Sequence, residues 1–209
     1  MTSETSREQL SLREIIRGRR SVRKYQDRPV PRALLEQLIE AAGWAPSPHG
    51  RQPWRFAVLT RAEPKLHLAE AMGDEWRRQL AFDGQDAATI ELRRRKSHER
   101  IITAPAIVIP CLYLAELDVY PDDGRNAAEA TMAIQSLGCA VQNLLLAAYA
   151  LGLDGGWMCA PLFCPGVVAD ALGLAPELTP HALITLGYAA ADPQRRPRKP
   201  PAELVVRFD

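Results

Sequence analysis

The densest group of chemically capable side chains lies near the amino terminus, where three arginines and a serine fall within five residues: Arg19, Arg20, Ser21 and Arg23. Guanidinium groups and a hydroxyl at this spacing can surround a phosphate group, because each guanidinium offers a fork of donors to its oxygens. Taken alone, such a run is more often a solvated basic turn. The segment predicts an anion site only if other features converge on it.

A second group lies in the loop 45–54, which offers four polar side chains in a short space: Ser47, His49, Arg51 and Gln52. Prolines, Pro46 among them, stiffen this loop, and Gly50 permits a close backbone approach to a ligand. Loops between a helix and a strand often carry binding residues. A plain structural turn explains the same residues equally well.

Two later segments complete the candidates. Gly155 and Gly156 would let a planar ring lie close to the backbone, although a simple turn is the commoner reason for paired glycines. The carboxy-terminal tail supplies a further basic set, which fits an anion site or a solvated end: Arg195, Arg196, Arg198 and Lys199.

Composition limits the possible classes. The chain has 209 residues, enough for one sizeable core, so residues 1–209 are expected to form a single domain. Its net charge of +1 argues against a polycation built for nucleic acid. The four cysteines form no C-x-x-C pair, so buried free thiols are expected rather than a zinc site, and no metal is assigned. Reduced cysteines and an amino terminus without an apolar core indicate the cytoplasm.

The elements that must position these residues follow from periodicity. Ser11 and Glu14 have capping-box spacing and open a helix expected to turn Leu12, Ile15 and Ile16 inward. A helix beginning at Pro31 places Leu34, Leu35, Leu38, Ile39 and Ala42 on one face. The alanine-rich stretch 127–153 predicts a buried helix of a soluble protein, not a membrane span. Other expected helices lie near 64–80 and 165–172, and residues 83–100 predict an exposed helix or a mobile excursion.

Strands are expected over 54–60, 106–109, 155–160 and 181–188, with a last one over 204–208. Helices and strands are mingled around one long buried helix, which predicts an α+β or three-layer α/β fold. The sequence has no P-loop, no dinucleotide-binding glycine fingerprint and no nucleophile elbow.

The segments together resemble the nitroreductase superfamily. Residues 19–25 resemble its R-R-S-x-R-x-[FY] signature, and Ala45-Pro46-Ser47 with Gln52-Pro53-Trp54 resembles its A-P-S…Q-P-W loop. Residues 152–157 resemble its G-L-G…W segment. Leu186-Gly187-Tyr188 with residues 196–200 resembles its L-G-Y…K-x-R-x-P ending. The motifs span nearly the whole chain in the family's order, and one departure is Gly50, where many relatives have asparagine.

The resemblance implies an α+β fold with a mixed antiparallel sheet, an intertwined homodimer and FMN at the subunit interface. It places Arg19, Arg20 and Ser21 at the phosphate and ribityl chain, and Arg23 at the pyrimidine edge, where a cation stabilises reduced flavin. Arg196 and Arg198 would close the phosphate site. The other implied flavin contacts are Pro46, Ser47, Gln52, Gly155 and Gly156.

Several runs are most similar to the carboxy-terminal, nitroreductase-like domain of FbiB, a ligase of coenzyme F-420 biosynthesis. That similarity implies reduction of a phosphoenolpyruvate-derived dehydro precursor of F-420 by hydride transfer from flavin N5, with His49 and Arg51 holding the anionic substrate. One alternative is a broad NAD(P)H-dependent nitroreductase or quinone reductase. Another is a non-catalytic flavin or deazaflavin carrier. In each case the partner is a small molecule, with neither nucleic acid nor membrane involved, and NAD(P)H is a possible electron donor.

Overall fold

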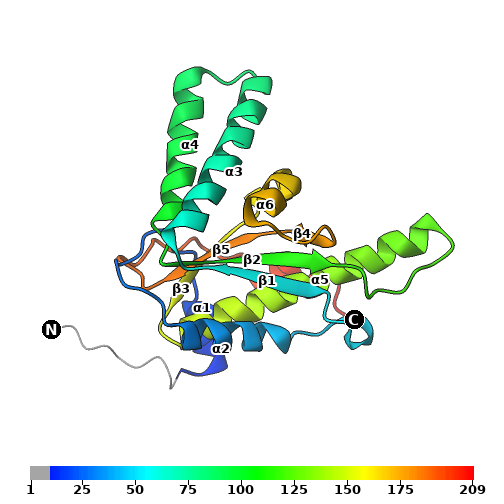
Figure 1. Ribbon diagram of the computed structural model, residues 1–209. Coiled ribbons are helices and arrows are strands. Elements are labelled where there is room, and N and C mark those ends of the chain that lie inside the picture. Colours follow the sequence, from blue (N-terminus) through cyan, green and yellow to red (C-terminus); the bar gives the residue numbers. More distant parts are fainter. Residues whose placement is uncertain (1–9) are drawn as a thin grey trace.

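A central antiparallel sheet organises the molecule, and the computed structural model describes residues 10–209 of it. The sheet order is β1-β2-β5-β3. β5 pairs with residues 106–108 of β2, and β4 pairs with residues 111–113 of the same strand. The strands are β1 (Trp54–Leu59), β2 (Ala106–Tyr113), β3 (Asp154–Met158), β4 (Leu178–Pro180) and β5 (Leu183–Gly187). Helices cover both faces, which confirms the predicted three-layer α+β fold (Figure 1).

The two faces of the sheet carry separate cores. Ala106 and Val108 face one core and Ile107 and Ile109 the other, because successive strand side chains point to opposite faces. The first core is covered by α1 (Leu12–Gly18), α2 (Arg32–Gly43) and α5 (Asp123–Ala150). The second is covered by α3 (Ala62–Phe82), α4 (Ala87–Ile102) and α6 (Pro165–Leu172). Short helical turns η2 (Pro48–Gly50), η3 (Ala160–Phe163) and α7 (Pro201–Leu204) complete the elements.

The long helix α5 is the centre of the first core. By length and composition it is the one helix of the described residues that could cross a membrane. Its apolar face packs instead against α2 and the sheet, through Leu137, Val141, Leu144 and Leu145. Asn143 Nδ2 donates to the Ala41 carbonyl at 3.3 Å and fixes α5 to α2. The prediction of a buried core helix is therefore confirmed.

The helices expected from capping and periodicity are present, with one difference in α1. The Ser11–Glu14 capping box forms in both directions, and α2 buries Leu35 and Leu38 as predicted. Leu12 and Ile16, expected to face inward, are 67% and 52% exposed. The reason is that α1 contacts α5 through its last turn, where Gly18 lies against the Tyr149 ring. The segment 83–100 largely forms α4, which packs along α3 as a two-helix arm rising from the sheet (Figure 1).

Two strand predictions need correction. The strand expected to stop at Ile109 continues to Tyr113, through Pro110. The proline is tolerated because it falls between the stretch of β2 that pairs with β5 and the stretch that pairs with β4. The strand expected over 204–208 does not form: α7 ends at Leu204, and Val206 and Phe208 are fully exposed. No neighbouring strand lies beside this segment in the described chain to supply its hydrogen bonds.

The cysteines are free, as expected, but they are not all buried. Cys111 lies inside β2, where burial raises the pKa of its thiol to about 11. Cys139 and Cys159 are exposed and Cys164 is half-buried, so only one of the four is fully enclosed.

Candidate active site

The amino-terminal arginine segment is joined to the edge strand β3. Ser21 bridges to Gly155, and the Val22 N–H donates to the Gly155 carbonyl at 3.0 Å. A Cβ on Gly156 would lie 2.5 Å from the Val22 carbonyl oxygen, so only glycine permits this approach. The paired glycines thus position the arginine segment. The expected contact of Gly155 and Gly156 with a flavin ring stays a prediction.

Tyr25 fixes the far end of the same segment. Its hydroxyl lies 2.9 Å from the Val22 carbonyl oxygen and 2.7 Å from Thr185 Oγ1. Burial, reinforced by the negative charge of Asp154, raises the pKa of Tyr25 well above its ordinary value, although the hydrogen bond with Thr185 lowers it. The hydroxyl therefore stays protonated and holds residues 22–25 on β5 at neutral pH.

Arg20 turns inward and is held by carboxylates. Its Nη1 lies 3.4 Å from Asp154 Oδ1, and its Nε forms a close ion pair with Asp192 of the tail. The Asp154 side chain is 1% exposed and that of Arg20 13% exposed. Because these acids already occupy Arg20, it serves the segment by anchoring it between β3 and the tail.

Arg19, unlike Arg20, has no carboxylate partner among the described residues. Its Nε is buried and makes no hydrogen bond within the described chain. Burial lowers the pKa of Arg19, and the positive charge of Arg198 lowers it further. The two guanidinium groups therefore lie close enough to repel one another. A buried donor and repelling cations are the arrangement that a phosphate dianion satisfies.

Arg195 attaches the carboxy-terminal tail to the end of α1, next to the arginine segment. Its guanidinium donates to the Arg17 carbonyl at 2.7 Å, at the carboxy-terminal end of α1, where a helix dipole favours a cation. Arg196 follows on the exposed tail, and Ser21 and Arg23 are exposed as well. The structure thus brings together six of the predicted residues: Arg19, Arg20, Ser21, Gly155, Gly156 and Arg198.

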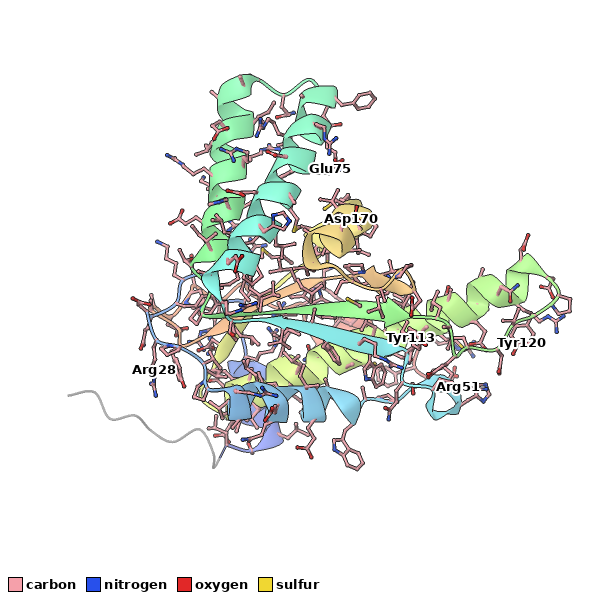
Figure 2. All side chains as sticks on the ribbon, viewed as in Figure 1. Arg28, Arg51, Glu75, Tyr113, Tyr120 and Asp170 are labelled. Carbon is pink, nitrogen blue, oxygen red and sulfur yellow. The ribbon has the colours of Figure 1, made fainter. Side chains whose placement is uncertain are left out.

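The loop 45–54 lies elsewhere. Ser47 Oγ accepts from the Gln52 N–H at 3.0 Å and closes the loop. His49, Gly50 and Gln52 all have positive φ, of 53°, 67° and 49°. Glycine adopts this conformation freely, but the other two hold it at a cost in backbone energy that often marks a functional loop. Figure 2 shows Arg51 beside Tyr120, at the opposite end of the molecule from Arg28.

The two groups are far apart within one chain. His49 lies near Glu129 on α5, with their nitrogen and oxygen atoms within 4.8 Å, whereas Gly18 contacts Tyr149 on the same helix. Twenty residues of α-helix separate these two contact points, or about 30 Å at 1.5 Å per residue. The loop 45–54 and the arginine segment therefore lie near opposite ends of α5 in one chain.

Arg51 was expected to bind an anionic substrate, but its guanidinium is already paired with a carboxylate. Arg51 Nη2 donates to Asp118 Oδ1 at 2.7 Å, and His49 Nε2 lies 4.0 Å from Asp118 Oδ2.

Sequence reasoning missed Asp118, Glu129 and Asp154. Asp154 carried a detectable signal, namely a lone acid at the start of an otherwise apolar and glycine strand, which needs a buried cation.

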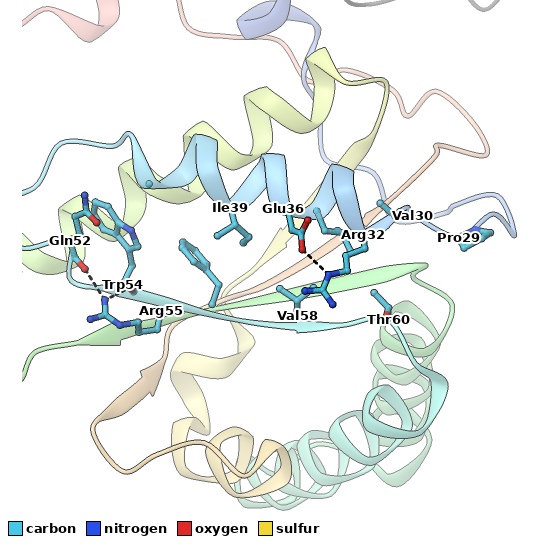
Figure 3. A pocket seen from close by; sticks show the side chains of 13 residues that line it. Pro29, Val30, Arg32, Glu36, Ile39, Gln52, Trp54, Arg55, Val58 and Thr60 are labelled. Atoms are coloured by element: carbon cyan, nitrogen blue, oxygen red, sulfur yellow. Dashed lines mark hydrogen bonds and ion pairs between the residues drawn. The ribbon is translucent and has the colours of Figure 1, made fainter.

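A groove of about 990 Å³ adjoins this loop. It runs between α2 and β1, from Gln52 to Pro29 (Figure 3). Ile39, Trp54 and Phe56 give it apolar lining, and the Arg32–Glu36 ion pair, 2.7 Å long, lies along its α2 side. Because β1 ends the sheet order, the groove borders a free strand edge.

Comparison with known proteins identifies the family of the chain. The model of the "Nitroreductase family" matches residues 16–188. A Methanothermobacter thermautotrophicus protein, provisionally named an NADH dehydrogenase/NAD(P)H nitroreductase, is 30% identical over 88% of this chain and 80% of its own length. A Desulfovibrio desulfuricans structure in complex with FMN, provisionally named a nitroreductase, has a TM-score of 0.72 and 28% identity, covering 96% of this chain and 98% of that one.

A BluB-like flavoprotein from Clostridium difficile 630 has the same fold, with a TM-score of 0.77 at 23% identity over 96% of this chain and 100% of that chain. The family model covers both the arginine segment and the loop 45–54, together with the whole sheet. The chain belongs to the nitroreductase family of oxidoreductases.

Proposed function

We propose that the chain is an FMN-dependent oxidoreductase that takes hydride from NAD(P)H and passes it to an electron-poor small molecule such as a nitroaromatic or a quinone. The single observation that carries the proposal is the buried Nε of Arg19, which has no hydrogen-bond partner among the described residues, together with the repulsion between Arg19 and Arg198. A phosphate there completes the hydrogen bonding of Arg19 and removes the repulsion between the two cations. The names of the relatives support the nicotinamide donor.

FMN would be held at its phosphate by Arg19, Ser21 and Arg198, with Arg196 beside them on the tail. When bound, the flavin supplies the hydride chemistry of the family. The protein supplies position and charge: Arg20 and Tyr25 hold the segment, and exposed Arg23 offers a cation near the ring end. No side-chain nucleophile is required.

The proposal includes a homodimer, because a second copy would bring the two groups of residues to one flavin. Pro46, Ser47 and Gln52 reach a flavin only if they come from a second copy, since they lie about 30 Å along α5 from the arginine segment of their own chain. A twofold arrangement builds two such sites at once. Its support is that the single chain leaves many large apolar side chains exposed, among them Leu12, Ile16, Ile134, Val206 and Phe208.

Reduction of an F-420 precursor is the weaker assignment. It was expected to use Arg51 to hold the anionic substrate, and Arg51 is paired with Asp118. An anion there must compete with a carboxylate already in place. Neither the Methanothermobacter nor the Desulfovibrio relative is named for F-420 biosynthesis, so this substrate becomes one arm of the test. The free thiols keep the cytoplasm as the expected compartment.

The test is anaerobic spectroscopy of the FMN-loaded dimer. NADH and NADPH are added separately, and bleaching of the flavin absorbance reports reduction. A nitroaromatic, a quinone and the dehydro precursor are then offered to the reduced enzyme. The proposal expects fast bleaching with one nicotinamide and reoxidation by the first two acceptors. Bound flavin that neither nicotinamide reduces would contradict it and favour a carrier, and reoxidation by the precursor alone would restore the F-420 assignment.

A further inference from the structure

A cluster of metal-ligating side chains lies at the loop end of the molecule, outside the arginine segment. His49 of η2, Asp118 of the connection before α5, and Glu129 of α5 offer one nitrogen and two oxygens, all within 4.8 Å of one another. The three residues come from three separate elements, 11 to 80 positions apart in sequence. Chain proximity alone therefore does not account for the convergence.

Glu129 is the buried member of this cluster. The residue is 5% exposed, and among the described residues no lysine, arginine or histidine lies within ion-pair distance, 4.0 Å, of its carboxylate. Its only hydrogen bond there is a long one, 3.4 Å, from the Tyr120 hydroxyl. A buried carboxylate without a cation is unfavourable, because burial removes its hydration without compensation.

The local charge balance also favours a cation. Arg51 is committed to Asp118 Oδ1, and Arg125 is committed to Asp122 while its guanidinium lies 4.9 Å from the Tyr120 ring centre. Counting Asp118, Glu129 and Arg51, the cluster carries a net charge of −1 with neutral His49. Asp118 Oδ2, the oxygen that Arg51 leaves free, is the one that faces His49 Nε2.

The positions of the ligands are fixed by their elements to different degrees. Asn126 bonds both the N–H and the carbonyl of Tyr120, at 2.8 and 2.9 Å, and so holds the connection on the first turns of α5. Glu129 is anchored on α5, whereas the His49 side chain is 60% exposed and can turn, and Asp118, 40% exposed, is held by Arg51 through Oδ1. In a tetrahedral site, metal–ligand bonds of about 2.0–2.2 Å place the ligand atoms about 3.4 Å apart. The three ligand atoms lie within 4.8 Å of one another, and rotation of the exposed His49 side chain can bring them closer.

We infer that His49, Asp118 and Glu129 form a binding site for a divalent transition-metal ion of the zinc class. One imidazole and two carboxylates suit Zn²⁺, Co²⁺ or Mn²⁺ better than a thiolate-seeking ion. Three protein ligands leave coordination positions open to water or to a small anion. The ion joins η2 and the connection before α5 to the helix itself, and it gives Glu129 the cation that it lacks.

The experiment uses the full chain without a histidine tag, with its flavin, dialysed against chelator and then titrated with ZnCl₂ by calorimetry. Co²⁺ is added in parallel, because its visible spectrum separates nitrogen and oxygen ligands from the exposed thiols of Cys139 and Cys159. The inference expects one ion per chain, a Co²⁺ spectrum without thiolate bands, and a rise in Tm with added Zn²⁺.

The variants are His49→Ala, Asp118→Asn and Glu129→Gln, with His67→Ala as the matched control, since His67 is an exposed histidine on α3. Each of the first three should weaken the metal affinity by more than about tenfold, and the control should leave it unchanged. Asp118→Asn keeps the test valid if the buried Glu129→Gln substitution impairs folding. Failure of the wild type to bind Zn²⁺ or Co²⁺, or equal binding by His49→Ala and His67→Ala, would overturn the inference. Neither outcome depends on flavin reduction, so the result is distinct from that of the proposed function.

Discussion

The two ends of α5 hold opposite electrostatic environments. At the Tyr149 end, Arg19 and Arg198 repel one another and Arg19 keeps a buried donor unused. At the Glu129 end, Arg51 is neutralised by Asp118, and Glu129 leaves a surplus of negative charge. One end is arranged for an anion and the other for a cation, on the same helix about 30 Å apart.

The contrast shows that a basic residue in a family motif is informative only with its partners. Arg19 and Arg20 are adjacent in sequence and look alike, yet Arg20 is held by Asp154 and Asp192 while Arg19 is not paired within the described chain. Arg51 looks equally available in sequence and is occupied in the structure. We therefore propose that Arg19 binds the ligand and that Arg20 positions Arg19.

The largest effect is expected from Gly156→Ala, which breaks the anion end. The added methyl group would lie 2.5 Å from the Val22 carbonyl oxygen and 2.9 Å from Thr185 Oγ1, and this overpacking should cost about 3 kcal/mol in the free energy of unfolding. FMN affinity should fall with it. Gly166→Ala on α6 is the control, because its added methyl group would have no neighbour within 4 Å and helix propensity predicts unchanged or slightly higher stability. Urea unfolding of both variants measures the two free energies of unfolding. Equal values would contradict the packing argument.

The second-largest effect is expected from Asp154→Asn, which removes the buried carboxylate that holds Arg20. Asp154→Asn leaves Arg20 with exposed Asp192 alone, and breaking a buried pair should cost about 2 kcal/mol of unfolding free energy. Thermal and urea unfolding of the flavin-free protein measure this cost. Asp192→Asn, at the exposed partner, should cost much less; a reversed order would show that the buried carboxylate is not the anchor.

Arg19→Ala separates binding from stability. Loss of charge-assisted bonds to a phosphate should raise the Kd for FMN about 30-fold, corresponding to about 2 kcal/mol. Stability of the flavin-free protein should stay the same or rise, because the substitution removes an unsatisfied donor and the repulsion with Arg198. Fluorescence titration with FMN gives the first quantity, and Arg17→Ala, on the exposed side of α1, is the control. An unchanged Kd would remove Arg19 from the cofactor site.

Tyr25, which holds the arginine segment on β5, should make the free energy of unfolding depend on pH. Because the folded state raises the pKa of Tyr25, the unfolded chain releases this proton first, above about pH 10, and stability is lost as pH rises through that range. Tyr25→Phe should cost about 1 kcal/mol at neutral pH through its lost hydrogen bonds. Its stability should then fall less steeply than that of the wild type above about pH 10. Parallel pH profiles of the two proteins would contradict the assigned pKa direction.

The smallest effect is expected at the other end of the helix. Arg51 and Asp118 are 42% and 40% exposed, so Arg51→Ala should change the unfolding free energy by less than about 1 kcal/mol. A dimer that uses this loop at the flavin should still bind FMN phosphate normally, since Arg51 is already neutralised. A large loss of FMN affinity in Arg51→Ala would sharpen the account by showing that the ion pair opens when the cofactor binds.

Periodicity and capping predicted the helices well, because their signals are local. The Ser11–Glu14 box and the Leu35–Leu38 face need no knowledge of the rest of the chain. The exposure of Leu12 and the missing strand over 204–208 could not be predicted this way, because both depend on what other surfaces are available to cover them. Pro110 misplaced the end of β2, since the change of partner strand that tolerates a proline is a long-range property.

The candidate site was predicted in part. Residue types and order located the arginine segment, the loop and the glycines. They did not reveal that Asp154 occupies Arg20 or that Asp118 occupies Arg51, because these pairs join residues 134 and 67 positions apart. Nor did sequence order reveal that the loop and the arginine segment lie at opposite ends of α5.

The most direct test of the central claim, a flavin site shared between two copies, is complementation in mixed dimers. One chain carries Arg19→Ala with Arg198→Ala, the other carries Ser47→Ala with Gln52→Ala, and each homodimer alone should lose FMN. Random mixing gives heterodimers in about half of the dimers, each with one site built from two intact halves, so about a quarter of wild-type FMN occupancy should return. Recovery of this fraction on co-expression is the predicted result. No recovery, with heterodimers shown to form, would contradict the shared site.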